Sequence, residues 1–302
     1  MSNTAKKKQN KTDYLELLDI PFKNFIKIVH ENDLKNVIVS LDPTQPILIT
    51  DGSLTQENFT LATEKNIDHS INENRSDFLD ELHCSAKLIQ NPKDFFKDPV
   101  KAMFDSHSSK QGSESELIYN QTFNQSNMKR SMANGVEAVL TQAHFPKSTI
   151  RIAVSVLDEL FTNAIYNAPY MDDENLSSGA ERSINNIILP EGKHIEIFVG
   201  KNDTDIIVGC RDPFGSLNID YIKEKILNCY KVGASDAMNL TTVGGAGIGT
   251  YLLVEASATY IAAVNEGKET IVMASLPIKM SNKKRSEYPK NYHFIKYKEG
   301  DK

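Results

Sequence analysis

The chain has little cysteine, and its cysteines form no motif. The three cysteines, at positions 84, 210 and 229, are spread through 302 residues without a Cys-x-x-Cys pair. This spacing argues against a zinc site and a disulfide framework, and it favours a reducing cytoplasm. We expect Cys210 to be a small buried strand residue rather than a nucleophile.

Long apolar runs and an excess of positive charge are also lacking. No apolar run approaches the roughly 20 residues that a membrane span requires. The first residues, MSNTAKKKQNKTDY, are basic and polar and lack the apolar stretch of a secretory signal. The formal net charge of −6 argues against a nucleic-acid binder. We therefore expect a soluble cytoplasmic protein whose partners include neither membrane nor nucleic acid.

Composition divides the chain into segments. The polar, Ser-rich stretch DSHSSKQGSESE has no periodicity and predicts a linker. Before it, short β-branched runs such as PILIT alternate with a helical pattern, as in a small α/β domain. The predicted segments are a disordered start (1–12), a small α/β domain (13–104), a linker (105–127), a nucleotide-binding domain argued below (128–280) and a basic tail (281–302).

The role of the first domain stays open. A receiver-like arrangement would place Asp42 or Asp51 at the end of a strand. A lone aspartate in that position is usually a turn former, so we assign no chemistry to it.

From residue 128 onward the pattern becomes clearer. Two helical patterns are followed by a hairpin, a helix, a glycine-rich loop, a further helix and a second hairpin. Hairpins interleaved with helices indicate a largely antiparallel sheet that is covered on one face. The predicted fold class is therefore α/β, with this half of the chain forming a two-layer α/β sandwich.

The glycine-rich loop is GGAGIG, at residues 244–249. Glycines before a helix suggest a backbone that approaches an anion closely. A Walker loop would end in Gly-Lys-Ser/Thr, whereas here Gly249 is followed directly by Thr250. A dinucleotide fingerprint would follow a strand, and the preceding MNLTTV is a poor strand.

Three polar residues elsewhere in the chain are suitable partners for this loop. Glu159 and Asn163 are four residues apart and lie on one side of a predicted helix. A carboxylate there can accept the proton of a hydroxyl or a water, and an amide oxygen can help to hold magnesium. Asp212 ends an apolar strand, where its carboxylate can accept a hydrogen bond from an adenine amino group.

The segments DELFTNAIYNAP, DPFG and GGAGIG resemble, in order, the N, G1 and G2 boxes of the GHKL (Bergerat-fold) ATP-binding domain. The resemblance covers residues 128–280 and implies ATP and Mg²⁺ as ligands. It implies Asn163 as the metal ligand, Glu159 as the catalytic base, Asp212 and Gly215 at the adenine, Gly245, Gly247 and Gly249 along the phosphates, Thr250 opening the next helix and Thr270 near the aspartate.

The chain departs from the family pattern at two places. The family's Asp-x-Gly-x-Gly turn reads Asp212-Pro-Phe-Gly215-Ser here, with Gly215 displaced by one position. The position that is often lysine in histidine kinases is Tyr166. The adenine floor therefore differs, and other groups must meet the phosphate charge.

Among the family's classes, the chain is most similar to the anti-sigma-factor serine kinases. His144 is followed by Phe-Pro, which ends a helix, and His107 lies in the predicted linker, so neither fits a phosphoacceptor histidine. Topoisomerases and mismatch-repair ATPases carry a further transducer domain after the ATPase domain. Because only a short tail follows residue 280 here, we set these two classes aside. The resemblance implies transfer of the γ-phosphate to a serine or threonine of a regulatory partner, such as a sigma factor or an anti-anti-sigma-like protein. The sequence leaves open whether the chain forms a homodimer.

Two alternatives remain. One is an ATP-responsive binding module that transfers no phosphate, in which a bound nucleotide orders residues 238–243 as a lid. The other is an atypical histidine-kinase-like protein.

The basic tail carries several aromatic residues, which we expect to pack on the domain rather than to contact an acidic partner or nucleic acid.

Overall fold

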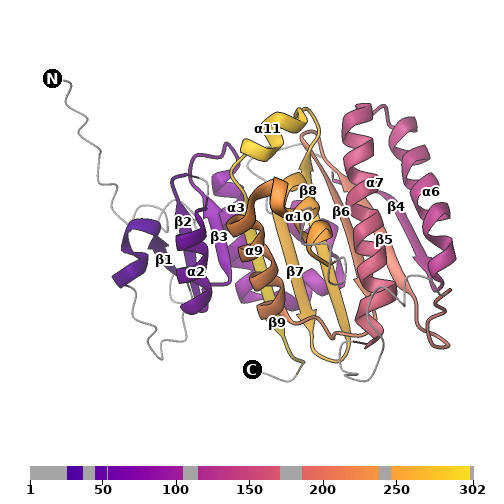
Figure 1. The fold of residues 1–302 in the computed structure, drawn as a ribbon, viewed down its shortest axis with the longest axis horizontal. Coiled ribbons are helices and arrows are strands. Elements are labelled where there is room, and N and C mark those ends of the chain that lie inside the picture. The colour runs from indigo at the N-terminus through magenta and orange to yellow at the C-terminus, as the bar shows by residue number, and fades with distance from the viewer. Residues whose placement is uncertain are drawn as a thin grey trace.

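The computed structural model describes residues 26–36, 45–52, 54–104, 115–170, 186–237 and 246–299. Its centre is one mixed sheet of nine strands in the order β1-β2-β3-β9-β7-β8-β6-β5-β4 (Figure 1). The strands are β1 (Ile26–His30), β2 (Gln45–Thr50), β3 (His69–Asn72), β4 (Glu116–Phe123), β5 (Ile195–Lys201), β6 (Asp205–Asp212), β7 (Thr259–Asn265), β8 (Glu269–Pro277) and β9 (Asn291–Tyr297).

Helices and helical turns connect these strands. They are η1 (Glu31–Asn36), α2 (Gln56–Glu64), α3 (Phe78–Gln90), α4 (Pro92–Lys97), α5 (Pro99–Phe104), η3 (Ser126–Met128), α6 (Lys129–Gln142), α7 (Lys147–Thr162), η4 (Asn163–Asn167), η5 (Ala168–Tyr170), α9 (Ile219–Ala237), α10 (Ala246–Ala256) and α11 (Asn282–Glu287). Among the described residues, no helix is both long and apolar enough to span a membrane.

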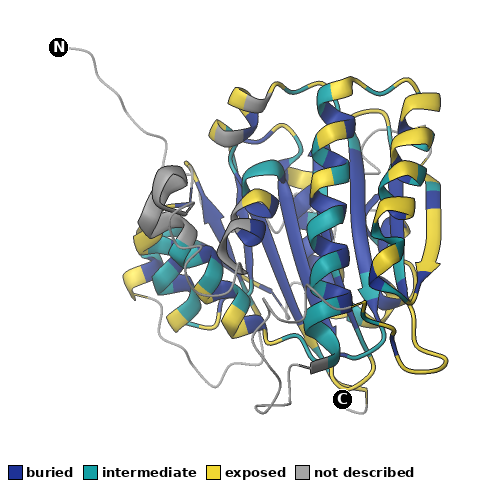
Figure 2. Ribbon diagram, turned by 45° about the vertical axis from the view of Figure 1, so that its right-hand side comes forward, coloured by how far each residue is buried: buried dark blue, intermediate teal, exposed yellow. Residues whose placement is uncertain are grey.

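Both faces of the sheet are buried, because successive strand residues enter different hydrophobic clusters. Ile206 and Val208 of β6 pack with α6, α7 and α10, whereas Ile207 between them packs with α3, α4 and α5. Strand side chains alternate between faces, so these helices form two separate layers. Figure 2 shows the central strands buried, with the edge strand β4 largely exposed.

The two-layer sandwich expected for residues 128–280, with helices on one face only, is not confirmed, because helices cover both faces of these strands. Within residues 128–280, the helices α6, α7, α9 and α10 all contribute to one cluster. The opposite face of the same strands is covered by α4 and α5, whose Phe96, Val100 and Phe104 pack against Phe198 and Met273. Helices from the first hundred residues therefore complete the burial of the second half of the sheet.

Residues from the predicted N-terminal domain and the predicted tail belong to the same sheet. The strands β1, β2 and β3 are parallel to one another, and β3 pairs antiparallel with β9. In turn, β9 pairs parallel with β7. The tail strand thus joins the two halves of the sheet. Its Tyr292 and Phe294 are in the core and its Tyr297 is partly buried, as expected for a packed tail.

The predicted linker is wrong over part of its length. Residues 116–123 form β4, which pairs antiparallel with β5 along nearly its whole length. Tyr119 and Phe123 of this strand are buried. The low hydrophobicity of the stretch reflects its place at the edge of the sheet, where most of its side chains face solvent. Residues 1–12 and 105–114 lie outside the described residues, as do residues 238–243 and Asp42.

A buried polar network joins β3, β9 and α3. The Nδ1 atoms of His69 and His293 are 3.1 Å apart, so one ring donates a hydrogen bond to the other. His293 Nε2 lies 3.2 Å from Glu81 Oε2. The Glu81 carboxylate also accepts hydrogen bonds from Arg75 and Thr259. Because one ring nitrogen must accept, the histidine pair requires an unprotonated acceptor.

We predict that acid weakens the fold through this pair. Burial, the neighbouring His293 and the charge of Lys223 hold the pKa of His69 well below its usual 6.5. The unfolded chain therefore takes up a proton near pH 6.5 that the folded chain refuses, and stability falls as the pH drops through that value. The free energy of unfolding, measured by urea titration, should fall by on the order of 1–2 kcal/mol from this group between pH 7 and pH 5.

The variant His69→Gln should have a shallower pH dependence over this window, whichever way its absolute stability moves. His194→Gln is the matched control, because His194 is exposed. An unchanged slope in His69→Gln would contradict the prediction.

Candidate functional site

The predicted polar pair lies where α7 widens into a single π turn. Asn163 Nδ2 donates a hydrogen bond to Glu159 Oε1 at 2.9 Å, and Asn167 Nδ2 donates to Asn163 Oδ1 at 3.0 Å. Burial raises the pKa of Glu159, and the Asn163 hydrogen bond and the charge of Lys129 partly offset it. π turns inside helices occur frequently at functional sites. Asn163 and Asn167 both belong to this widened turn, and the hydrogen bond between them keeps their side chains together.

Asp212 ends β6 and is buried, with 7% of its surface exposed. It pairs in register with Thr270 of β8, and its Oδ1 accepts a hydrogen bond from the Phe214 backbone at 3.0 Å. Burial raises the pKa of Asp212 to about 6, although the Phe214 hydrogen bond and the Thr270 hydroxyl favour its ionised form. The Asp212 carboxyl group is thus a buried hydrogen-bond acceptor.

Gly215 has a structural role in the turn that follows Asp212. Its φ of +62° is in the left-handed region, which favours glycine. A Cβ at this position would overlap the Asn265 carbonyl of the β7–β8 turn, and Gly267 donates its N–H to the Gly215 carbonyl at 3.1 Å. Gly215 therefore anchors the Asp212 turn to the neighbouring hairpin.

The glycine-rich loop leads into α10, which begins at Ala246, earlier than the expected start at Thr250. Gly245 lies outside the described residues, and Gly247 and Gly249 are in the first turns of the helix. A Cβ on Gly249 would overlap the Glu159 carboxylate. The glycine at this position therefore allows the backbone of α10 to lie directly against Glu159.

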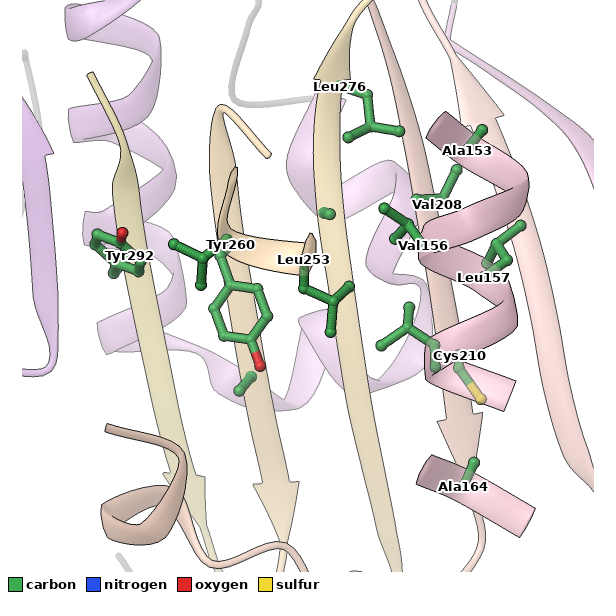
Figure 3. Packing of buried hydrophobic residues seen from close by; sticks show 14 of the residues in the cluster. Ala153, Val156, Leu157, Ala164, Val208, Cys210, Leu253, Tyr260, Leu276 and Tyr292 are labelled. Carbon is green, nitrogen blue, oxygen red and sulfur yellow. The ribbon is translucent and has the colours of Figure 1, made fainter. Parts of the chain in front are cut away.

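A cavity of about 510 Å³ lies between α7, α9, α10 and the strands β6, β7 and β8. Figure 3 shows Cys210, Tyr260, Leu253 and Ala164, one from each of four elements that surround it. Four of the residues predicted from the sequence line it together: Asn163, Asp212, Thr250 and Thr270. Glu159, Gly215, Gly247 and Gly249 are not among its described lining residues.

Sequence reasoning missed the α9 wall of this cavity. Tyr221, Ile222 and Lys225 line it from that helix, and Asn218 lines it from the position just before the helix. Their spacing of three and four residues is the signal that could have found them, because such residues share one face of a helix. Tyr260 of β7 also lines the cavity, and burial raises the pKa of its hydroxyl.

The residues fit an adenine nucleotide in size and chemistry. The cavity volume is within the usual range for small-molecule sites. Asp212 offers a buried acceptor for an amino group, and the strand and helix residues around it are largely apolar. The Asn163 oxygen accepts one hydrogen bond and has a second lone pair for a cation. Within the described part of the chain, no cluster of three or more His, Cys, Asp or Glu side chains is suited to a metal ion.

Neither a comparison with models of protein families nor a search of curated proteins found a match for this chain.

Proposed function

We propose that this chain is a cytoplasmic ATP-binding regulatory protein that transfers the γ-phosphate of MgATP to a serine or threonine of a partner protein. The supporting observation is the cavity lined by Asn163, Asp212, Thr250 and Thr270. These residues come from four different elements and are far apart in the sequence. They are also residues that the resemblance to GHKL proteins assigns to one nucleotide.

The order of elements supports the finer assignment to a Bergerat-type fold. The hairpins β5–β6 and β7–β8 are antiparallel, and α6, α7, α9 and α10 pack on one face of them. In this proposal, the helices α3–α5 and the strands β1–β3 are additions to a two-layer nucleotide-binding unit.

Each residue has a distinct task in the proposed reaction. Asp212 accepts a hydrogen bond from the adenine amino group, and Asn163 supplies an oxygen ligand to magnesium, which when bound neutralises phosphate charge. Glu159 accepts the proton of the partner's hydroxyl while the hydroxyl oxygen bonds to the γ-phosphorus. The bond from that phosphorus to the β–γ bridging oxygen breaks, and ADP leaves. The burial that raises the pKa of Glu159 makes it a stronger base.

The first prediction from this proposal concerns binding. Asp212→Ala removes the buried acceptor, so its affinity for MgATP, measured by calorimetry, should fall roughly 10- to 100-fold, as for loss of a hydrogen bond to a charged group. Asp203→Ala is the control, because Asp203 is exposed in the β5–β6 turn. No heat from the native chain with MgATP would refute the proposed function.

One observation favours the second candidate function, an ATP-responsive binding module without transfer. Glu159 is hydrogen-bonded to Asn163 and covered by Gly249, and it is not among the described residues that line the cavity. The two functions differ in one measurement, incubation with labelled ATP and a lysate. A labelled protein band that disappears with Glu159→Ala supports the kinase, whereas nucleotide binding without labelling supports the module.

The partner in either case is a regulatory protein, such as a sigma factor or an anti-anti-sigma-like protein, and the chain acts alone or as a homodimer.

A further inference from the structure

The cavity has a charge pattern that the sequence motifs do not account for. Among its described lining residues, the only charged side chains are those of Asp212 and Lys225. The position that is often lysine in related kinases is Tyr166 here. A nucleotide bound in this cavity brings several negative charges toward walls whose other described polar side chains, such as Asn163 and Thr250, are neutral.

Lys225 is on the α9 wall, two turns beyond the residues nearest to the Asp212 turn. Asn218, which caps the start of α9 through its contact with the Tyr221 backbone, closely follows that turn in the chain. Lys225 is seven positions after Asn218 in the sequence, which corresponds to about 10 Å along the helix axis. Lys225 is therefore about two helical turns from the start of α9, which is the end of the helix that follows the Asp212 turn in the chain.

The Lys225 ammonium is held at the cavity wall by an aromatic ring. Its Nζ lies 5.0 Å from the centre of the Tyr221 ring, one turn earlier on α9. Within the described part of the chain, the Lys225 ammonium contacts this ring and forms no ion pair with a carboxylate. A cation–π contact positions the charge without neutralising it. The ammonium is thus available to an anion in the cavity.

We propose that Lys225 is the cation that binds the phosphates of the nucleotide, with Asp212 selecting the base at the other end. This inference rests on the proposed function. In this inference, Lys225 of α9 supplies the positive charge that a lysine at position 166 often supplies in histidine kinases. Lys225 is accordingly a specificity residue that distinguishes nucleotides from nucleosides.

The test compares MgATP and adenosine by calorimetry. Lys225→Ala should weaken MgATP binding about tenfold or more, as for loss of a hydrogen bond to a charged group, and leave adenosine binding within about twofold. Lys225→Arg should retain most of the affinity for MgATP. Lys296→Ala is the matched control. It removes one exposed positive charge from β9, where Lys296 pairs with Asp220 of α9, the helix that carries Lys225.

Each other outcome overturns the inference in a distinct way. Equal weakening of both ligands would place Lys225 at the base or indicate a distorted α9. No change with either ligand would make Lys225 a solvated lysine. Binding of neither ligand by the native chain would refute the proposed function itself, and the inference with it.

Discussion

Ending the chain at Pro289 is expected to unfold the whole protein rather than to trim a tail. This truncation removes β9, which lies between β3 and β7 in the sheet. Its Tyr292, Phe294 and Ile295 are at most 5% exposed. Burial of a large apolar side chain contributes about 1.5–3 kcal/mol, so the loss is on the order of 5 kcal/mol or more. That loss is comparable with the total stability of many domains.

The loss of β9 also breaks the continuity of the sheet. Without it, β1–β3 have no strand through which to join β7, and the buried histidine pair loses His293. Circular dichroism and thermal unfolding should show no cooperative transition in the truncated chain. A chain that ends at Glu299 is the control and should unfold like the native protein. Cooperative unfolding of the shorter chain would contradict the place of β9 at the centre of the sheet.

Gly249→Ala is expected to abolish most of the proposed phosphate transfer while leaving the fold nearly as stable as before. The added methyl group would occupy the space of the Glu159 carboxylate and drive it from its hydrogen bond with Asn163. That carboxylate ends a flexible side chain, so it can move at little cost. Alanine also favours a helix by about 1 kcal/mol over glycine. The free energy of unfolding should therefore change by no more than about 1 kcal/mol.

The transfer rate should fall much further than the stability. Displacing a general base typically lowers a rate by about 100-fold or more. The assay is transfer of labelled phosphate from ATP, with Gly52→Ala as the control, because a Cβ on Gly52 would meet nothing within 4 Å. In a Glu159→Ala background, Gly249→Ala should have little further effect, since both substitutions remove one carboxylate from one place. A native rate in Gly249→Ala would exclude Glu159 as the base.

Much of the candidate site could be predicted from local patterns. The spacing of Glu159 and Asn163 places them on one side of a helix, and Asp212 ends an apolar run, as in the structure. The contact between Gly249 and Glu159 could not be predicted, because it depends on how α10 packs against α7. The α9 wall with Lys225 was missed for a similar reason: helical spacing shows that its residues share a face, but not what that face meets.

Local patterns in the sequence predict the order of helices and hairpins in residues 128–280 and the residues proposed to surround one nucleotide. Local periodicity and turn residues carry that information, because they act between near neighbours in the chain. Long-range packing alone places β9 between the two halves of one sheet and α3–α5 over its second face. Pairings such as β3 with β9 join residues more than 200 positions apart, and the short, polar β3 has no local pattern that specifies its partner.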